Sequence, residues 1–154
     1  MISSALLDGI VAAIWPYVVM FVAAFGAATL LPIPSEVVLA AQIKAGAASV
    51  SGLVVAATVG NVGGALFNWW LGRSLRHYEN RSWFPFTPHG IARASSIFQR
   101  WGIWTLLLSW VPVVGDPLTL VAGLLRVRLA AFIPLVTIGK AARYIAFAAG
   151  LDMI

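Results

Sequence analysis

The chain has 154 residues, of which 61% are hydrophobic and only 10% are charged, and its mean hydropathy is +0.94. Soluble domains carry about 25% charged residues, so this few charges cannot cover the surface of a water-soluble globule. The composition therefore excludes an ordinary cytosolic enzyme, a nucleic-acid-binding protein and a disordered chain. The lack of cysteine excludes disulfides, thiolate metal sites and cysteine nucleophiles. We predict an all-helical integral membrane protein with one membrane domain over residues 1–154.

Four apolar regions follow one another along the chain. The regions 50–72 and 129–150 have the roughly 20 apolar residues that cross a bilayer, and we predict them as spans. The regions 9–45 and 102–125 are each interrupted by prolines and an acidic residue, and we predict them as helical hairpins. The first region is not expected to be a cleaved signal, because no basic residue occurs before Lys44.

The two interruptions have similar chemistry. Their helix-breaking residues are Pro32 and Pro34 in the first, and Pro112, Gly115 and Pro117 in the second. Irregular backbone at membrane depth is tolerated only where protein or water surrounds it. We therefore interpret both regions as re-entrant hairpins with their tips inside the bilayer. The alternative is a pair of proline-kinked helices that continue across the membrane.

The two halves of the chain also resemble each other. Placing Pro32 on Pro112 also places Glu36 on Asp116. Broken segments at corresponding positions of two halves are typical of transporters built from inverted repeats. The predicted architecture is thus two re-entrant helical hairpins plus transmembrane helices in a pseudo-inverted repeat.

Basic residues gather between the halves and at the end of the second hairpin. They are Arg73, Arg76, Arg81, Arg93, Arg100, Arg126 and Arg128. The other side of the predicted topology has only Lys44. The positive-inside rule then places the middle connection, residues 73–101, in the cytoplasm and both chain ends outside. Arg73 and Arg100 are predicted to lie at the membrane interface.

The middle connection contains one predicted surface helix. Residues 91–101 have apolar side chains at helical spacing, which favours an amphipathic helix. Two roles fit it: docking against the second hairpin, or recruitment of lipid headgroups. The aromatic residues Trp83, Phe84 and Phe86 just before it suit an anchor at the membrane interface.

Four ionisable residues remain inside the apolar regions: Glu36, Asp116, Lys140 and Arg143. Charges at this depth are costly unless they are paired or hydrated, and they usually mark a substrate or proton pathway. Lys140 and Arg143 are three residues apart and share a helix face, whereas the two acids lie at the predicted tips. With Asn61 they form our candidate pathway. The alternative is an ion-pair network that only holds the hairpins together.

Motifs of enzymes are missing from the sequence. It has no HExxH, GxSxG, P-loop or dinucleotide-binding fingerprint, and His77 and His89 both lie in the middle connection. We expect no catalytic residue, metal site or cofactor.

Several motifs together resemble one family of membrane proteins. They are Leu31-Pro32-Ile33-Pro34-Ser35-Glu36, Gly60 to Arg73 ending in Leu71-Gly72-Arg73, Phe98-Gln99-Arg100-Trp101-Gly102, Pro112-Val113-Val114-Gly115-Asp116-Pro117, Ala122-Gly123 and Gly139-Lys140-Ala141-Ala142-Arg143-Tyr144. In this order they resemble the DedA family, whose members carry the VTT (SNARE-associated) domain, and within it the small bacterial YqaA-like branch. The resemblance runs from about residue 20 to residue 150.

The resemblance implies two facing re-entrant hairpins in a bacterial inner membrane. It also implies lipid transport, either flipping or scrambling of phospholipid or recycling of a polyprenyl phosphate, with a link to the proton motive force. Glu36 falls on the family's first-hairpin acid. The family also has arginines beside the second-hairpin proline, where this chain has Ser109 and Gly115, and a second acid where it has Ala48.

Our leading hypothesis is a flippase or scramblase in which Asp116, Lys140 and Arg143 are the candidates to replace the missing family residues. The expected partners are anionic phospholipid or undecaprenyl phosphate, protons and a second copy of the chain, but no nucleic acid. The alternatives are a small ion or proton channel and a structural protein that organises the membrane.

Overall fold

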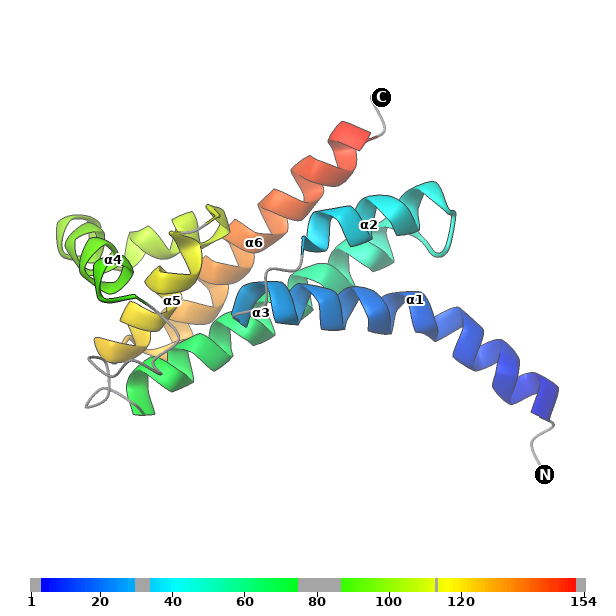
Figure 1. Ribbon diagram of the computed structural model, residues 1–154, viewed down its shortest axis with the longest axis horizontal. Coiled ribbons are helices and arrows are strands. Elements are labelled where there is room, and N and C mark those ends of the chain that lie inside the picture. The colour runs from blue at the N-terminus through cyan, green and yellow to red at the C-terminus, as the bar shows by residue number, and fades with distance from the viewer. Residues whose placement is uncertain (1–3, 30–33, 75–86, 113, 152–154) are drawn as a thin grey trace.

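The computed structural model describes residues 4–29, 34–74, 87–112 and 114–151. Within these ranges the chain forms helices joined by short turns, without any strand. The elements are α1 (Ser4–Thr29), α2 (Ser35–Lys44), α3 (Val50–Ser74), α4 (Pro88–Trp101), the 3-10 helix η2 (Gly102–Trp110), α5 (Gly115–Leu124) and α6 (Leu129–Leu151). Figure 1 shows an elongated bundle in which α3 extends along most of the long axis. The prediction of an all-helical protein is confirmed for this part of the chain.

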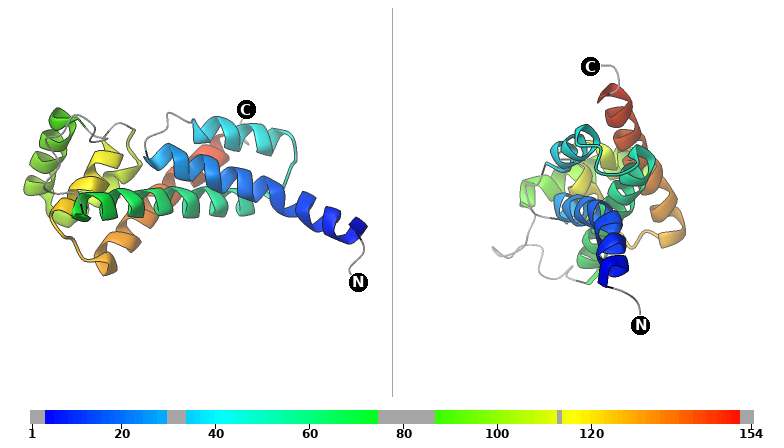
Figure 2. Two further views of the ribbon diagram at one scale, coloured as in Figure 1. Left: turned by 60° about the horizontal axis from the view of Figure 1, so that its bottom comes forward. Right: turned by 90° about the vertical axis from the view of Figure 1, so that its right-hand side faces the viewer.

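Helices α1 and α2 form the first helical hairpin. α1 runs toward the middle of the molecule, and α2 begins there and runs back (Figures 1 and 2). α2 starts directly after Pro34, whose carbonyl accepts hydrogen bonds from the amides of Val37 and Val38 at 2.9 and 3.3 Å. The predicted tip residue Pro32 lies outside the described residues. Pro34 therefore lies directly before the first residue of a helix. The fixed φ and the missing amide hydrogen of proline favour this position.

The second hairpin is built from η2 and α5. η2 reaches the middle of the molecule, the chain turns at Pro112, and α5 returns from Gly115 (Figure 1). The turn is tight: a Cβ on Gly115 would collide with the carbonyl of Ser109, so only glycine fits this close approach. Pro117 occupies the first turn of α5, where no intrahelical partner needs its amide.

Helix α3 is the common support of both hairpins. Its first half packs along α1, where a Cβ on Gly64 would lie 2.7 Å from both the Cβ of Ala28 and the carbonyl oxygen of Phe25. Its last turns pack along α5, where Gly72 faces the Leu120 carbonyl and Gly123 of α5 faces Trp69. Small residues thus let three backbones come close without intervening side chains, the usual mode of helix association in membranes.

Helix α6 crosses the bundle and contacts η2, α3 and α2. A Cβ on Gly139 would lie 2.7 Å from the carbonyl oxygen of Leu107 in η2. The equivalent contact in the first half is made by Gly60 of α3, which faces the carbonyl of Phe21 in α1. In each half, therefore, a glycine of the long final helix lets a backbone carbonyl of the first hairpin helix approach closely.

Two hydrophobic clusters occupy the two ends of the bundle. One joins the second half of α3 to α4, η2, α5 and α6, and includes Trp69, Phe98 and Phe132. The other joins α1, α2, the first half of α3 and α6, and includes Met20, Leu39, Leu53, Ala57 and Tyr144.

Helix α4 packs across the second hairpin. The side chain of Thr87 caps it by accepting the Gly90 amide at 3.1 Å, and its apolar face buries Ala94 and Phe98 against the first cluster. Trp101 is 62% exposed at its end. This packing favours the docking role over lipid recruitment. The proposed aromatic anchor, Trp83, Phe84 and Phe86, lies outside the described residues.

Among the described helices, three are long and apolar enough to cross a membrane: α1 over Leu7–Thr29, α3 over Val50–Ser74 and α6 over Leu129–Leu151. The sequence predicts two spans, over 50–72 and 129–150, and both lie in helices of spanning length. The third helix of this length is α1, which the sequence predicts as part of a re-entrant hairpin. The second hairpin is shorter, because η2 and α5 have 9 and 10 residues.

Because α3 approaches α1 closely at Gly60, we predict that a larger residue there destabilises the protein. A Cβ there would collide with the Phe21 carbonyl, so Gly60→Ala should lower the free energy of unfolding by about 1–3 kcal/mol, more than the gain in helix propensity of about 1 kcal/mol. Gly9→Ala is the matched control, because nothing lies within 4 Å of its position in α1. Thermal unfolding of both variants in detergent measures the difference, and equal stabilities would contradict the packing described here.

Candidate polar site between the hairpins

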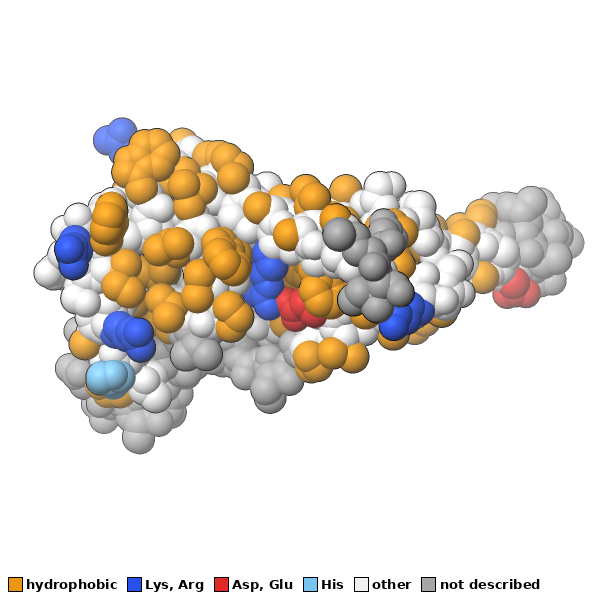
Figure 3. Space-filling view, turned by 90° about the horizontal axis from the view of Figure 1, so that it is seen from above, with side chains coloured by type: hydrophobic (Ala, Val, Ile, Leu, Met, Phe, Trp, Pro, Cys, Tyr) orange, Lys and Arg blue, Asp and Glu red, His pale blue; other side chains and the backbone are white. Residues whose placement is uncertain are grey.

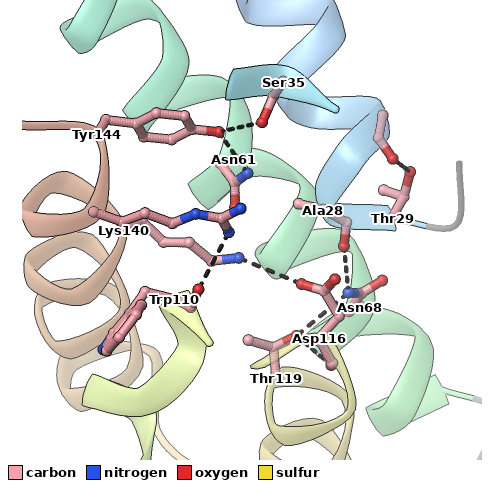
Figure 4. A network of polar contacts seen from close by, with 12 residues as sticks. Ala28, Thr29, Ser35, Asn61, Asn68, Trp110, Asp116, Thr119, Lys140 and Tyr144 are labelled. Atoms are coloured by element: carbon pink, nitrogen blue, oxygen red, sulfur yellow. Dashed lines mark hydrogen bonds and ion pairs between the residues drawn. The ribbon is translucent and has the colours of Figure 1, made fainter. Parts of the chain in front are cut away.

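A cluster of polar and charged side chains lies between the two hydrophobic clusters, where the hairpins meet α6 (Figure 4). Glu36 stands in the first turn of α2, and Asp116 stands in the first turn of α5. Both acids are thus at helix N-termini, where the helix dipole stabilises negative charge. Lys140 and Arg143 approach them from the middle of α6.

Each hairpin is connected to α6 by one ion pair. The Lys140 Nζ lies 3.3 Å from Asp116 Oδ1, and the Arg143 guanidinium pairs with the Glu36 carboxylate. A second nitrogen of Arg143 donates to the Trp110 carbonyl at 3.2 Å. α6 therefore supplies both cations and each hairpin supplies one anion.

The two pairs differ in their access to the surroundings. The Lys140 side chain is 2% exposed and its partner Asp116 is 31% exposed, whereas Arg143 and Glu36 are 25% and 21% exposed. The ammonium of Lys140 is thus enclosed by protein. The Arg143 and Glu36 side chains are each partly exposed, although Glu36 Oε1, the oxygen that pairs with Arg143, is itself buried.

A neutral hydrogen-bond network surrounds the Glu36 pair. The buried hydroxyl of Tyr144 accepts a hydrogen bond from Asn61 Nδ2 at 2.9 Å and lies 3.0 Å from Ser35 Oγ. Ser35 in turn donates to Glu36 Oε2 at 3.3 Å. These contacts connect α3, α6 and α2 at one point.

Asn68 makes a similar connection at the second hairpin. Its Nδ2 donates to the Ala28 carbonyl in the last turn of α1 at 2.8 Å and to Thr119 Oγ1 in α5 at 3.3 Å (Figure 4). Thr119 also donates to the Asp116 carbonyl at 2.7 Å. Because the last carbonyls of a helix have no partner within it, this amide satisfies one that would otherwise be orphaned.

The surface around the site is apolar. In Figure 3, an acidic and a basic patch lie side by side near the middle of the long axis, with hydrophobic side chains on either side. Most of the other basic side chains in this view lie toward one end of the molecule, and one lies in the opposite half. A charged patch among hydrophobic side chains can bind the charged part of a ligand whose remainder is apolar.

The structure brings all five residues of the predicted pathway together: Glu36, Asn61, Asp116, Lys140 and Arg143. Sequence reasoning missed Tyr144 and the Trp110 carbonyl, and it gave Ser35 no role. Tyr144 follows Lys140 by four residues, so its position on the same helix face was a signal that could have been used.

The predicted hairpin breaks Pro34, Pro112, Gly115 and Pro117 lie at or beside the ends of α2, η2 and α5 next to this site. The predicted interfacial residues lie apart from it. The Arg73 guanidinium stacks over the Trp69 ring at 5.3 Å, and Arg100 over Trp101 at 5.9 Å, as cation–π pairs. In the part of the chain that the structure describes, no three His, Asp or Glu side chains are placed to hold a metal ion.

These features define a helical membrane protein with a charged site between two helical hairpins. Residues 33–153 match the VTT domain, and the chain belongs to the VTT-domain (DedA) family. It is 42% identical over 130 residues to the inner membrane protein YqaA of Escherichia coli and to that of Shigella flexneri, covering 84% of this chain and 87% of each relative. It is also 36% identical over 137 residues to an uncharacterized protein of Haemophilus influenzae, covering 82% of both chains. No solved structure matches the chain. The family resemblance seen in the sequence motifs is confirmed.

The difference in enclosure predicts unequal effects of neutralising the two acids. Asp116→Asn leaves the enclosed Lys140 ammonium without its counter-charge and should cost about 3 kcal/mol of unfolding free energy. Glu36→Gln should cost less, because Arg143 is partly exposed and keeps its bond to the Trp110 carbonyl. Thermal unfolding in detergent measures both.

The double variant Asp116→Asn with Lys140→Met is the control for this comparison. It removes both charges, so it should recover part of the stability lost in Asp116→Asn. A larger loss in Glu36→Gln than in Asp116→Asn would contradict the assignment of Lys140 as the enclosed cation.

Proposed function

We propose that the protein is a lipid transporter, a flippase or scramblase that moves phospholipid or a polyprenyl phosphate across the bacterial inner membrane. The observation that carries the proposal is the partly exposed Glu36–Arg143 ion pair, which joins the first hairpin to the middle of a helix of spanning length. A lipid crossing the membrane needs a polar place for its headgroup at this depth, while its acyl chains stay in the surrounding bilayer. The names of the YqaA relatives support the inner membrane location.

The architecture proposed with this function is a pair of re-entrant hairpins in an inverted repeat. Three observations support it. α2 and α5 both begin in the middle of the molecule, and each has an acid in its first turn. In each half, a glycine of the long helix packs against the first helix of the hairpin. Helix N-termini at mid-depth attract anionic substrate groups in other transporters with broken helices.

In the proposed mechanism the lipid phosphate competes with Glu36 for Arg143. The guanidinium is suited to this exchange because it binds carboxylate and phosphate in the same bidentate geometry. The N-termini of α2 and α5 both lie at this site, and their helix dipoles favour an anion there. Protonation of Glu36 would release Arg143 to the phosphate, which gives a route for coupling to protons. The Lys140–Asp116 pair would keep α5 and α6 together meanwhile.

The orientation proposed places the α4 end of the bundle in the cytoplasm. Arg73, Arg93, Arg100, Arg126 and Arg128 all belong to elements or connections at that end, and Lys44 ends α2 in the other half (Figures 1 and 3). The positive-inside rule then directs this end inward. Arg76 and Arg81 lie outside the described residues.

A topology experiment tests this orientation. The first residues of α1 and the last residues of α6 lie away from the α4 end, so we expect both chain ends outside the cytoplasm (Figure 1). Alkaline phosphatase fused to either terminus should be active, and a fluorescent protein that folds only in the cytoplasm should be dark. A bright fusion at either terminus would overturn the orientation.

A liposome assay tests lipid transport directly. The purified protein is reconstituted with a fluorescent phospholipid, or with a fluorescent polyprenyl phosphate in a second set, and dithionite is added outside. Transport should allow quenching beyond the half of the label that lies in the outer leaflet. Arg143→Ala should lower the rate about tenfold or more, because a charge-assisted hydrogen bond contributes about 1.5–3 kcal/mol.

Arg93→Ala is the matched control, because it removes the same charge from the exposed face of α4 and should leave the rate unchanged. Quenching that stops at half with both lipids would reject lipid transport. Proton flux without lipid flux would instead identify a channel, and full activity of the double variant Glu36→Gln with Asp116→Asn would assign the charges a structural role only.

A further inference from the structure

The hydrogen bonds from Asn61 to Glu36 form a continuous chain through Tyr144 and Ser35. The chain passes through three helices, from α3 to α6 to α2. Asn61, Tyr144 and Ser35 are all buried, at 2%, 0% and 1% exposure, while the Glu36 side chain is 21% exposed. One end of the chain therefore lies in the interior and the other reaches the surroundings.

The direction of the protons along this chain is fixed by the number of hydrogens available. Asn61 Nδ2 can only donate, so the Tyr144 oxygen accepts from it. Ser35 has one hydroxyl hydrogen, which it donates to the Glu36 carboxylate, so the Tyr144 hydroxyl must donate to Ser35. The two hydroxyl hydrogens and the amide hydrogen thus all point toward Glu36. This direction fits an ionised Glu36, because a carboxylate can only accept hydrogen bonds.

The interior end of the chain has an unused acceptor. Asn61 Oδ1 is buried and has no hydrogen-bond partner among the described residues. An orphaned buried carbonyl oxygen is costly, by about 1–3 kcal/mol. A half-turn of the Asn61 side-chain amide would exchange its nitrogen and oxygen and present this acceptor to the Tyr144 hydroxyl.

We propose that Asn61, Tyr144 and Ser35 form a hydrogen-bond relay that reverses direction when Glu36 gains or loses a proton. When the Glu36 carboxylate takes a proton from water, its new hydroxyl donates to Ser35, Ser35 donates to Tyr144, and Tyr144 donates to Asn61 Oδ1. The two hydroxyl hydrogens rotate and the amide turns over. No proton moves along the chain, so the single proton gained is the one on Glu36.

The reversal has a consequence for the charged groups around Glu36. These are Arg143 and Lys140 on α6 and Asp116 on α5, whereas α3 presents the uncharged Asn61 and the described parts of α1 and η2 bring no charge to this place. A neutral Glu36 no longer forms an ion pair with the Arg143 guanidinium, and its Oε1 is left as a neutral hydrogen-bond acceptor. Tyr144 is next to Arg143 in α6, so one event weakens the hold on the guanidinium and changes the contact between α6 and α3.

The relay deepens the proposed function, since it would regulate the residue proposed to bind the lipid phosphate. In this role Tyr144 is a positioning residue that acts through Ser35 on Glu36. Its test uses spectroscopy and not lipid flux, so failure of the relay and failure of lipid transport are separate results.

Infrared difference spectra between neutral and acid pH test the relay on the purified full chain in lipid nanodiscs. Acidification should produce a carboxylic-acid C=O band that is lost in Glu36→Gln. It should also shift an amide C=O band that responds to ¹³C labelling of asparagine side chains and is lost in Asn61→Ala. In Tyr144→Phe the Glu36 band should remain and the Asn61 shift should disappear.

Tyr17→Phe is the matched control, because the Tyr17 hydroxyl bonds to the hydroxyl of Ser49, the residue before α3, and belongs to no contact of the relay. Both bands should persist in it. Three results would overturn the relay: no carboxylic-acid band from Glu36, no asparagine shift in the labelled wild type, or a shift that persists in Tyr144→Phe. The absence of an asparagine shift from the labelled wild-type spectrum would overturn the relay even where a variant fails to fold.

Discussion

The arrangement of this protein depends on the requirement that charges within an apolar chain find partners inside the molecule. Of the described helices of spanning length, α6 alone carries basic residues near its middle, Lys140 and Arg143. Each hairpin places an acid against one of them. Each ion pair therefore fixes the position of one hairpin turn relative to α6. Removing water from four charges is costly, and pairing them from different helices recovers that cost only in one relative placement of the hairpins and α6.

Close helix packing makes this placement possible. The glycines of α3 and α6 bring their backbones against the first helix of each hairpin, and Gly72 and Gly123 bring α3 against α5. These contacts put Asn61 and Asn68 of α3 within reach of α6 and of the ends of α1 and α5. The polar network thus depends on small residues beside it or one helical turn away, because a larger side chain at these positions would separate the backbones beyond hydrogen-bonding distance.

The two ion pairs are chemically alike but suited to different tasks. Lys140 is enclosed, so its pair with Asp116 cannot open without leaving a buried charge, and it is well placed to hold α5 and α6 together. The Glu36–Arg143 pair is partly exposed and has alternative partners, the Trp110 carbonyl for Arg143 and Ser35 for Glu36. A pair of this kind can exchange one partner for a ligand at small cost, which is why the proposed lipid site is at Arg143 and not at Lys140.

The sequence by itself determined the helical class, the two long helices over 50–72 and 129–150, the helix breaks at proline and the set of charges that had to meet. These follow from local rules: apolar length, proline's missing amide and the cost of an unpaired charge. The sequence did not determine which acid pairs with which base, because Lys140 and Arg143 share a face and either could reach either hairpin. Only the tertiary structure decided that pairing, the enclosure of Lys140 and the place of Tyr144 between Asn61 and Ser35, since burial and hydrogen-bond partners depend on side chains from helices distant in sequence.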